Sequence, residues 1–431
     1  MTPPRNEHAE DFAHSVVPEE ARIPRLKLTM VGWSLITGMA WLFYGALAAM
    51  LAGTQQAVIG LALSVVVFAL ANNRMTELAA STGLSSGLVS RKLFGPAGSA
   101  LIALLLAATT VYFAVFEGSV VAEAFRQYFG ADIRIWYAVV VVGMLPLMMG
   151  GVLTWMDKVN AYLLPLYVIG VVAALVAASR QGDLSSWWDA PGLGIPQTLP
   201  GWLTVFVLYL GVWLVMPTTV DFARFGRPAD IPFLRNVTFG WVFGAGIFLV
   251  NGVIGMLLVH LVIPGSPVAG ETGVVTALVG PLGLAGVLLI VVTQIRINTL
   301  NFYQSSMNLQ RLLRQLAGVS VSRPIVVTMV SALVFVLMLT DVFGYLQTAL
   351  KWQGSFFVGW VGIVVSHLLL RRQAAPGVGF GVWVISALAA IACLELGTPL
   401  LAELAPLIAL AVSVLGYVPL AVRAEAVTST T

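Results

Sequence analysis

The sequence predicts an all-α polytopic membrane protein with about twelve transmembrane helices. Composition is the first observation, because 59% of the 431 residues are hydrophobic and only 10% are charged, whereas a soluble domain has about 25% charged residues. The second is the recurrence of apolar runs long enough to cross the hydrocarbon, which takes ~20 residues per helix. The third is that lysine and arginine gather in alternate connections between these runs, as membrane topology requires.

The apolar runs are separated mostly by short connections. The expected spans are residues 28–52, 56–72, 97–127, 136–153, 159–179, 201–220, 236–263, 277–309, 324–340, 343–370, 377–396 and 399–421. The longest segments outside them are the N-terminal tail, 73–96 and 180–200, so no second, soluble domain is expected. The first run exceeds a signal-peptide core and no small-residue cleavage site follows it, which favours a first spanning helix.

The charges orient the bundle. With the N-terminus inside, 17 of the 22 lysines and arginines fall in cytosolic segments, three on the opposite side and two, Arg296 and Lys351, inside spans. Positively charged short loops stay in the cytosol. Both termini are therefore expected to be cytosolic, in a multi-pass protein of the plasma or inner membrane. Topology also explains the basic balance, so no nucleic-acid partner is expected.

Catalytic and metal-binding patterns are scarce. His8 and His14 lie in the tail, while His260 and His367 lie near the ends of spans, which fits interfacial histidines better than a catalytic pair. Cys393 is the single cysteine, so neither a disulfide framework nor a cysteine-based metal site is expected. An enzyme is therefore disfavoured, and no cofactor or bound metal is predicted apart from a coupling ion.

Two spans have the features of interrupted helices. The first reads VGWSLITGMAWLFYG (31–45) and the sixth GVWLVMPTTVDFARFG (211–226). The interrupting residues at mid-membrane depth are Gly32, Ser34, Thr37, Gly38, Gly211, Pro217, Thr218 and Thr219. Such clusters are tolerated where neighbouring helices or a cavity satisfy the freed backbone groups. The two spans lie five apart, and matching interruptions in two five-helix halves point to an inverted-repeat transporter. Ordinary glycine and proline content is the alternative.

Several motifs carry a family resemblance. VDFARFGRPAD (220–230) follows the sixth span, VPEEAR (17–22) precedes the first, and FGYL begins a stretch that ends in two arginines (343–372). The first span has a Gly32…Trp41 spacing, and the eighth aligns without gaps through Asn301. These features resemble the purine–cytosine permease branch of the nucleobase:cation symporter-1 family. The resemblance extends to about residue 372, and the last two helices match only as hydrophobic spans.

The resemblance implies a LeuT-type fold of two inverted five-helix repeats and two peripheral helices. Helices 1 and 6 are then broken around a midplane site that helices 3 and 8 complete. The expected segments are a cytosolic N-terminal tail (1–27), the inverted-repeat transport core of helices 1–10 (28–372), helices 11–12 (373–422) and a C-terminal tail (423–431). The resemblance also implies uptake of a nucleobase or related small N-heterocycle by alternating access, coupled to sodium or protons. A monomer in the lipid bilayer is expected.

The resemblance also assigns a substrate site. Planar heterocycles are held by aromatic faces and a few fixed polar groups. The expected substrate-binding residues are Thr37, Gly38, Tyr112, Trp213, Thr299 and Asn301. Tyr112 stands where the family has a stacking tryptophan and Trp213 near its second stacking aromatic, although a core aromatic explains each equally well and the register of helix 6 is open. Thr299 replaces an asparagine that reads the base edge in cytosine permeases. A hydroxyl lacks the amide's donor–acceptor pair, so cytosine itself is in doubt.

The sodium site of the family is altered. Its positions fall on Gly32, Leu35, Gln294, Ile297 and Asn298. Sodium needs a cage of oxygens, and Ile297 offers only its backbone. Arg296 lies between these positions, where the family has an aromatic residue, and a fixed positive charge there would repel sodium. Proton coupling is therefore slightly favoured, with Arg296 substituting electrostatically for the ion and holding helices 1, 5 and 8 together.

Three charges stand inside spans: Glu117 in the third, Arg296 in the eighth and Lys351 in the tenth. Uncompensated charges at this depth are costly. Helices 3, 8 and 10 are neighbours in the implied fold, so Glu117 is expected to pair with Arg296 or Lys351. Three interpretations stay open: a structural ion pair, a proton relay with Glu117 as carrier, and a site for an anionic substrate with Arg296 as a bidentate clamp.

Asp221, Arg224 and Arg227 lie at the cytosolic membrane edge after the sixth span. Topology alone predicts arginines there. The functional alternative is a cytoplasmic gate or helix cap, joined by pairing of Asp221 with an arginine. Such a gate acts in conformational cycling and not in substrate contact.

The sequence thus favours a secondary active importer of a nucleobase-like compound. The second choice is a carrier on the same scaffold for an anionic or amino-acid-like solute. A channel is least favoured, because polar residues cluster at the mid-depth of spans 1, 6 and 8 and do not line whole helix faces. Substrate and coupling ion stay open.

Overall fold

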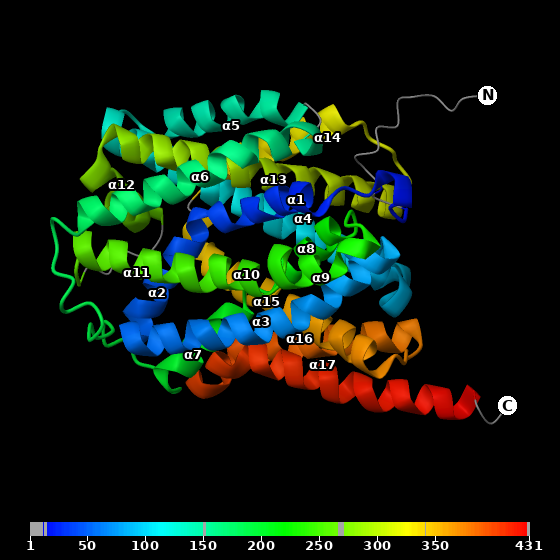
Figure 1. Cartoon of the computed structure of the whole chain (residues 1–431). Coiled ribbons are helices and arrows are strands. Elements are labelled where there is room, and N and C mark those ends of the chain that lie inside the picture. The colour runs from blue at the N-terminus through cyan, green and yellow to red at the C-terminus, as the bar shows by residue number, and fades with distance from the viewer. Residues whose placement is uncertain (1–11, 13–14, 150–151, 266–270, 341, 429–431) are drawn as a thin grey trace, which may run out of the picture.

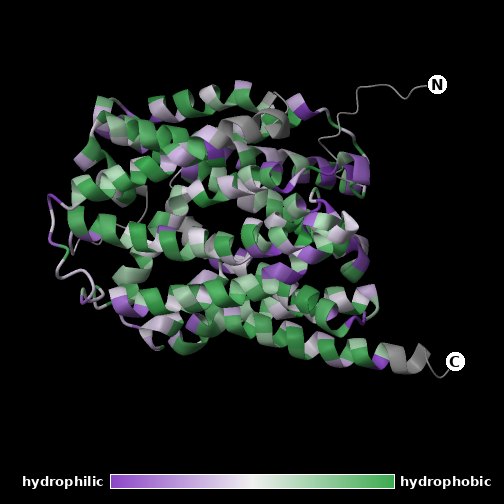
Figure 2. Ribbon diagram, in the orientation of Figure 1, coloured by the Kyte–Doolittle hydropathy of each residue, from purple (hydrophilic) through white to green (hydrophobic). Residues whose placement is uncertain are grey.

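The computed structural model describes residues 12, 15–149, 152–265, 271–340 and 342–428, with side chains for all of these except 149, 152–161, 271, 342–350 and 425–428. Within these residues the ordered elements are helices, and the extended pairing is an isolated bridge between Ile23 and Gly226. The long helices run side by side as one bundle (Figure 1). Hydrophobic residues cover most of their length (Figure 2). The prediction of an all-α membrane protein is confirmed.

Seven helices are long and apolar enough to cross a membrane by themselves, and two bent pairs bring the number to nine among the described residues. The seven are α3 (Thr54–Thr82), α4 (Ser86–Phe129), the segment Pro228–Val262, α13 (Leu284–Ala317), the Lys351–Leu370 part of α15 (Val342–Leu370), α16 (Pro376–Leu396) and α17 (Pro399–Thr428). Shorter apolar stretches are α5 (Ile133–Met149), the Tyr162–Ala178 part of α6 (Val152–Ala178), α12 (Glu271–Leu282) and α14 (Arg323–Met338). Of these, α5, α6 and α14 coincide with the fourth, fifth and ninth predicted spans.

The first bent pair is helix 1, which is broken as predicted. It consists of α1 (Arg25–Gly32), a 3₁₀ turn (Trp33–Thr37) and α2 (Met39–Ala52), and its two halves are bent by 46°. The hydroxyl of Thr37 donates to Ser34 O at 2.9 Å, so it bonds to the backbone of the turn. Gly38 is extended, with a ψ of 130°. Local hydroxyl bonding competes with a regular helix, which explains why the helix stops in this cluster.

The second bent pair is helix 6. It consists of α7 (Gly201–Leu210) and α8 (Val215–Ala223), again bent by 46°, with the break at residues 211–214. Pro217 falls in the first turn of α8, where its missing N–H removes no helical hydrogen bond. A Cβ on Gly354 of α15 would lie 2.9 Å from Gly211 Cα and O. The break in helix 6 is therefore packed directly against the tenth span.

The seventh span contains irregular helix. It runs through α9 (Ile231–Phe233), a π-helical segment at Leu234–Thr238, α10 (Trp241–Gly244), a second π-helical segment at Ala245–Val250 and α11 (Asn251–Val262). In α11, a Cβ on Gly255 would lie 2.0 Å from Leu42 O of α2. Helices 1 and 7 therefore approach through their backbones.

The segment 73–96 differs from its prediction as a connection. It is mostly helical, because α3 continues to Thr82 and α4 begins at Ser86. A kink at Gly95, with a φ of 74°, separates the first turns of α4 from its spanning part. Glycine adopts this backbone without strain. Polar composition placed this segment outside the membrane but did not show that it is helical.

The predicted eighth span, 277–309, covers the end of one helix and most of the next. Gly283, with a φ of 55°, separates α12 from α13. Residues 277–282 therefore belong to α12, and the span itself begins at Leu284. The run is apolar on both sides of Gly283, so hydropathy does not mark the boundary.

Helices 3 and 8, which are α4 and α13, form the most extensive helix contact of the bundle. Ser305 Oγ donates to Thr110 Oγ1 at 2.8 Å across it, and Asn298 Nδ2 donates to Ala114 O at 3.3 Å. The last two helices, α16 and α17, pack on each other and on α15 at one edge of the bundle (Figure 1). They have the peripheral place expected of helices 11 and 12.

The two described ends of the chain lie on the same side of the bundle. The segment Glu19–Ala21 and the C-terminal end of α17 are at the right of Figure 1, and the connection at 180–200 is at the opposite side. An even number of crossings places both ends on one side.

Candidate transport site

The second half of helix 1 begins with backbone N–H groups that are capped by another helix. Gly38 is the N-cap residue of α2 and offers no side chain. The carboxylate of Glu117, on α4, accepts hydrogen bonds from the backbone N–H groups of Met39 and Ala40. A carboxylate there satisfies orphan donors and complements the positive end of the helix dipole. Glu117 thus caps α2 across the interface between helices 1 and 3.

Gly38 stands in a tight place between two side chains. A Cβ at this position would lie 3.0 Å from Glu117 Oε1 and 3.2 Å from Trp41 Nε1. Trp41 Nε1 donates to Leu35 O at 2.7 Å and so joins the two sides of the break. The interruption of helix 1 is therefore held by specific side chains.

Aromatic rings lie around the Glu117 carboxylate. Tyr44 of α2 is close enough for an electrostatic interaction with Glu117. Its ring centroid lies 6.0 Å from that of Trp41 and 6.3 Å from that of Tyr209 on α7. Glu117 is 1% exposed, and its Oε2 has no hydrogen-bond partner among the described residues. A buried carboxylate oxygen thus lies where helices 1, 3 and 6 meet.

Arg296 of α13 is directed toward the first half of helix 1. Its side chain is 2% exposed, and Nη2 donates to Met30 O of α1 at 3.4 Å. It also interacts electrostatically with Tyr167 of α6. Arg296 therefore contacts helices 1 and 5, the two helices that the sequence interpretation joined to helix 8.

A chain of polar side chains continues from Tyr167. Its hydroxyl donates to Asn251 Oδ1 of α11, and Asn251 Nδ2 donates to Ile36 O in the 3₁₀ turn of helix 1, at 2.5 Å. Tyr167 and Asn251 are both buried. Helices 5 and 7 are therefore also tied to the broken part of helix 1.

The expected substrate-binding residues are all buried: Thr37, Gly38, Tyr112, Trp213, Thr299 and Asn301. Thr37 and Gly38 lie in the break of helix 1, and Trp213 lies in the break of helix 6. Thr299 Oγ1 donates to Ile295 O of its own helix at 2.6 Å. Asn301 Nδ2 is 3.5 Å from Asn298 Oδ1, at the limit of a hydrogen bond. The breaks of helices 1 and 6 thus carry three of the six.

The expected cation-site positions face different neighbours. A Cβ on Gly32 would lie 2.5 Å from the Phe239 ring, and Leu35 O accepts the Trp41 indole. Ile297 is buried, with 4% exposure. Gln294 and Asn298 line a pocket with residues of α4 and α5. They lie on a different face of α13 from Arg296, which contacts α1.

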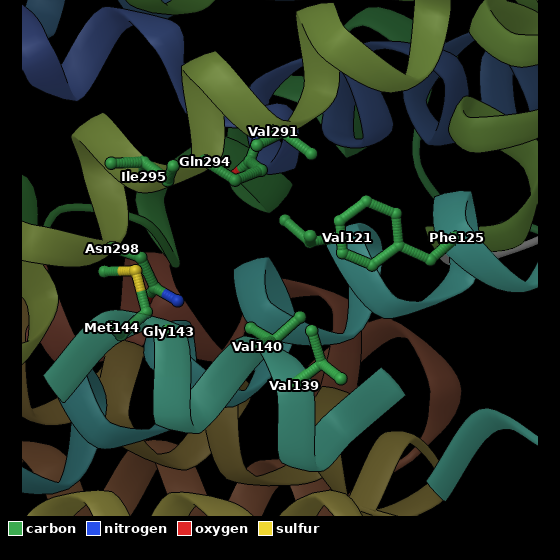
Figure 3. Close-up of a pocket in the computed structure, with 10 residues that line it drawn as sticks. All are labelled: Val121, Phe125, Val139, Val140, Gly143, Met144, Val291, Gln294, Ile295 and Asn298. Carbon is green, nitrogen blue, oxygen red and sulfur yellow. The ribbon is translucent and has the colours of Figure 1, made fainter. Parts of the chain in front are cut away.

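That pocket has a volume of about 190 Å³. Its lining residues are Val121, Phe125, Val139, Val140, Gly143, Met144, Val291, Gln294, Ile295 and Asn298. Figure 3 shows the α13 residues on one side and those of α4 and α5 on the others. Val139 is 47% exposed. The pocket therefore lies at the outer side of the helix 3–helix 8 contact and not between the two broken helices.

The three charges expected at membrane depth do not form the expected pairs. Within the part of the chain that the structure describes, no ion pair joins Glu117 to Arg296 or Lys351. Lys351 is exposed, in contrast to the burial expected of it. The other two side chains are buried, and each contacts the backbone of helix 1.

Asp221 joins helix 6 to helices 3 and 8 at the end of α8. Its carboxylate accepts hydrogen bonds from Ser86 N at 2.8 Å and Ser86 Oγ at 2.9 Å, in the first turn of α4. Arg311 Nη1 of α13 lies 3.9 Å from Asp221 Oδ2, and both side chains are buried. The expected helix cap and arginine contact are thus present, but the arginine is Arg311. Arg224 instead donates to the backbone O of Asp221 at 3.1 Å, and Arg227 is exposed.

The N-terminal segment packs on the same end of the bundle. Arg22 Nη1 donates to Ala80 O of α3 and to Gly226 O after α8, both at 2.5 Å. Burial lowers the pKa of the Arg22 guanidinium. Ile23 N donates to Phe225 O at 2.8 Å, and Arg224 Nη1 donates to Phe12 O at 2.6 Å. The segment that contains VPEEAR and the one that contains DFARFG therefore contact each other.

Sequence reasoning missed several residues of these networks. Arg311 was counted only as a topogenic charge, and Tyr167, Asn251 and Ser86 had no assigned role. One signal was present, because Asn251 lies inside an apolar run. Nothing in the sequence indicates that Arg311 is buried, because arginines are common at the cytosolic ends of spans.

No protein family model and no curated protein matches the sequence. The inward-facing conformation of Mhp1 matches with a TM-score of 0.73 and 16% identity, over 94% of this chain and 92% of that one. A closed conformation of Mhp1, a nucleobase-cation-symport-1 family transporter with bromovinylhydantoin bound, matches with a TM-score of 0.69 and 16% identity, over 95% and 94%.

A third solved structure is a substrate-bound outward-open state of a Na⁺-coupled sialic acid symporter. It matches with a TM-score of 0.62 and 14% identity, over 94% of this chain and 90% of that one. The matches cover nearly all of each chain, and both breaks lie in the predicted helices 1 and 6. The chain therefore has the LeuT-type fold of Mhp1, with two inverted five-helix repeats and two peripheral helices.

Proposed function

We propose that the protein is a secondary active transporter of the nucleobase:cation symporter-1 family, which imports a nucleobase or related small N-heterocycle by alternating access. One observation carries the proposal. Two helices five spans apart are broken at corresponding depths, on the fold of a transporter that binds a hydantoin. The motifs VPEEAR and VDFARFGRPAD support the family. They lie in segments that contact each other in the structure.

A carrier fits the buried polar groups better than a channel or an enzyme. Glu117 and Arg296 bond to the backbone of helix 1 on either side of its break. Asp221 and Arg311 close one end of the contact between helices 6 and 8. Interactions near the breaks and at one end are what a protein needs to open one side at a time. A channel requires a continuous polar path, and polar residues cluster at these two levels.

Proton coupling is the form of energy coupling that the Arg296 geometry favours. A guanidinium on helix 8 contacts Met30 O of helix 1 and interacts with Tyr167 of helix 5. A fixed positive charge between these helices supplies the electrostatic contribution that a sodium ion makes when it bridges helices 1 and 8. A second cation beside it would be repelled, so uptake is expected to be independent of sodium.

Uptake into proteoliposomes tests the function and the coupling ion separately. The assay offers radiolabelled uracil, cytosine, hypoxanthine and hydantoin under an inward proton gradient or an inward sodium gradient. Saturable accumulation driven by protons alone is expected. Arg134→Ala is the matched control for Arg296→Ala, because Arg134 is an exposed arginine outside the site.

Two results would contradict the proposal. Flux that rises linearly with concentration and carries an ohmic current would exclude a carrier. Sodium-dependent accumulation that persists in Arg296→Ala would exclude the idea that Arg296 takes the place of the ion.

A further inference from the structure

Three basic residues from distant parts of the chain lie together at one end of the bundle. These residues, Lys92, Arg371 and Arg372, are all exposed and form the basic cluster. Lys92 lies before the kink of α4 at Gly95, and the two arginines directly follow α15. Gln373 Nε2 donates to Lys92 O at 2.7 Å, which joins the two segments. This end of the bundle is at the right of Figure 1, where both described chain ends lie.

The helices beneath the basic cluster are held together by specific buried contacts. Trp360 Nε1 of α15 donates to Ser90 Oγ of α4 at 2.8 Å. The ring centroid of Phe94, also on α4, lies 4.9 Å from that of Trp383 on α16. All four side chains are buried. The fold itself therefore brings Lys92 next to the connection between α15 and α16.

Arg371 stands in a backbone conformation that favours glycine. Its N–H donates to His367 O at 2.8 Å, and its φ is 55°. Glycine is the usual residue in this left-handed position after a helix, and other residues are strained there. His367 Nδ1 lies 2.7 Å from Arg372 O, and the His367 ring is close enough to Lys92 for an electrostatic interaction. The connection thus positions two arginines beside the lysine at a conformational cost.

Other basic residues at this end of the bundle have an acidic partner. Arg74 Nη1 and Arg235 Nη1 lie 3.8 and 3.6 Å from Glu77 Oε2. The basic cluster differs, because no aspartate or glutamate occurs in residues 78–116 or 342–394, the two stretches that contain it. Its positive charge is therefore not balanced by its own segments.

The surroundings of the basic cluster match a lipid better than a soluble anion. Within the part of the chain that the structure describes, Lys92 and Arg371 form no ion pair. Leu369, in the last turn of α15, and Val378, in the first turn of α16, are 64% and 42% exposed. Positive charge beside exposed apolar side chains suits a phospholipid, and basic pockets at the cytosolic ends of spanning helices bind anionic headgroups.

We propose that Lys92, Arg371 and Arg372 form a binding site for the headgroup of an anionic phospholipid in the cytosolic leaflet. Membrane topology explains why basic residues lie at this end, but it does not explain why residues so far apart in the sequence form one cluster. The bound lipid ties the start of helix 3 to the connection between helices 10 and 11. This inference goes beyond the proposed transport function and does not depend on it.

The test measures lipid binding to the purified, full-length protein in detergent micelles. Phosphatidylglycerol and phosphatidylcholine with the same acyl chains are added separately. The melting temperature and the lipid retained in native mass spectrometry are recorded. Phosphatidylglycerol is expected to raise the melting temperature and to be retained, and phosphatidylcholine is not. Raising the ionic strength from about 0.1 M to about 1 M shortens the screening length from about 10 Å to about 3 Å, so binding of phosphatidylglycerol should weaken.

The main variant is Lys92→Gln combined with Arg371→Gln. Each basic residue near an anionic lipid surface contributes about a fivefold gain in affinity. The double variant should therefore bind phosphatidylglycerol roughly 25-fold more weakly. Arg371→Gly removes one charge and also relieves the backbone strain. Without lipid it should melt no lower than wild type, and it should still lose about fivefold in affinity, so this loss cannot come from unfolding.

Arg74→Gln combined with Arg235→Gln is the matched control. It removes the same number of charges at the same end of the bundle, from side chains that are 56% and 42% exposed. Because Glu77 balances these two arginines, the control should bind phosphatidylglycerol as wild type does.

Four results would overturn the inference. Equal stabilisation by the two lipids would show that headgroup charge is not recognised. Unchanged affinity in the folded Lys92→Gln/Arg371→Gln protein would show that the basic cluster is not the site. Equal losses in the control would show diffuse attraction to the whole basic end of the bundle. Stabilisation of the same size by inorganic phosphate would show an anion site without preference for lipid.

Discussion

The buried contact between Asp221 and Arg311 leads to a quantitative prediction. The two side chains are 2% and 3% exposed, and their charged atoms are 3.9 Å apart. Asp221 also accepts two hydrogen bonds from Ser86. Removing one member of a buried pair leaves the other charge without this counter-charge, which typically costs about 3–5 kcal/mol. Neutralising both members removes that penalty, so the two substitutions should not be additive.

The variants are Asp221→Asn, Arg311→Gln and the combination of both. The unfolding entropy of a 431-residue chain is about 0.9 kcal/mol per kelvin by the average for globular proteins. Each single substitution should then lower the melting temperature by about 3–5 °C. The double variant should lose clearly less than the sum. Tryptophan fluorescence during heating, in one detergent, measures all four proteins. Arg227→Gln is the control, since Arg227 belongs to the same motif but is exposed.

Additive losses in the double variant would refute the reasoning, because they would show that the two charges do not interact. The interpretation of this contact as a cytoplasmic gate predicts one further result. If the contact closes the cytosolic side during each cycle, Asp221→Asn should change the exchange rate of substrate across the membrane at unchanged binding affinity. If Asp221 only caps α4, the rate should follow the amount of folded protein.

Two further predictions follow from close approaches and from the N-terminal segment. Gly255→Ala should destabilise the protein by about 1–3 kcal/mol through overpacking, because its Cβ would lie 2.0 Å from Leu42 O. Gly143→Ala, whose Cβ would have nothing within 4 Å, should leave the melting temperature unchanged, and equal losses in both variants would contradict the close α2–α11 contact. Arg22→Gln removes donors to Ala80 O and Gly226 O, so amide hydrogen exchange at Val17 and Ile23 should accelerate. The exposed Arg91 provides the control Arg91→Gln, and unchanged exchange in Arg22→Gln would show that this contact does not hold the segment.

The fold could be predicted to the level of its broken helices because the signals are local. Ser34, Thr37 and Gly38 act on the backbone of their own turn, and the helix stops there. Apolar length and the lysine and arginine bias also need no tertiary information. The boundary at Gly283 escaped prediction because it depends on backbone geometry inside an apolar run.

Side-chain partners could be predicted only in part, because they depend on which helix faces meet. Arg296 was expected to join helices 1, 5 and 8, and its side chain contacts Met30 O of helix 1 and interacts with Tyr167 of helix 5. Glu117 was expected to need a cation, and its partners are backbone N–H groups instead. Sequence reasoning matched charge with charge and overlooked the partial charges at a helix break. Lys351 shows the opposite error, since its place in an apolar run suggested burial that the structure does not have.

The break of helix 1 explains how Glu117 and Arg296 are accommodated without pairing with each other. A helix ends in carbonyl groups with partial negative charge and begins with N–H groups of partial positive charge. Arg296 contacts Met30 O in the last turn of α1, and Glu117 contacts the first N–H groups of α2. Each charge therefore faces the half-helix end of opposite sign. Because both contacts are with helix 1, a change in the angle between its halves alters the environment of both charges at once. The two halves of helix 1 are thus each held by a different neighbour, α1 by Arg296 of α13 and α2 by Glu117 of α4.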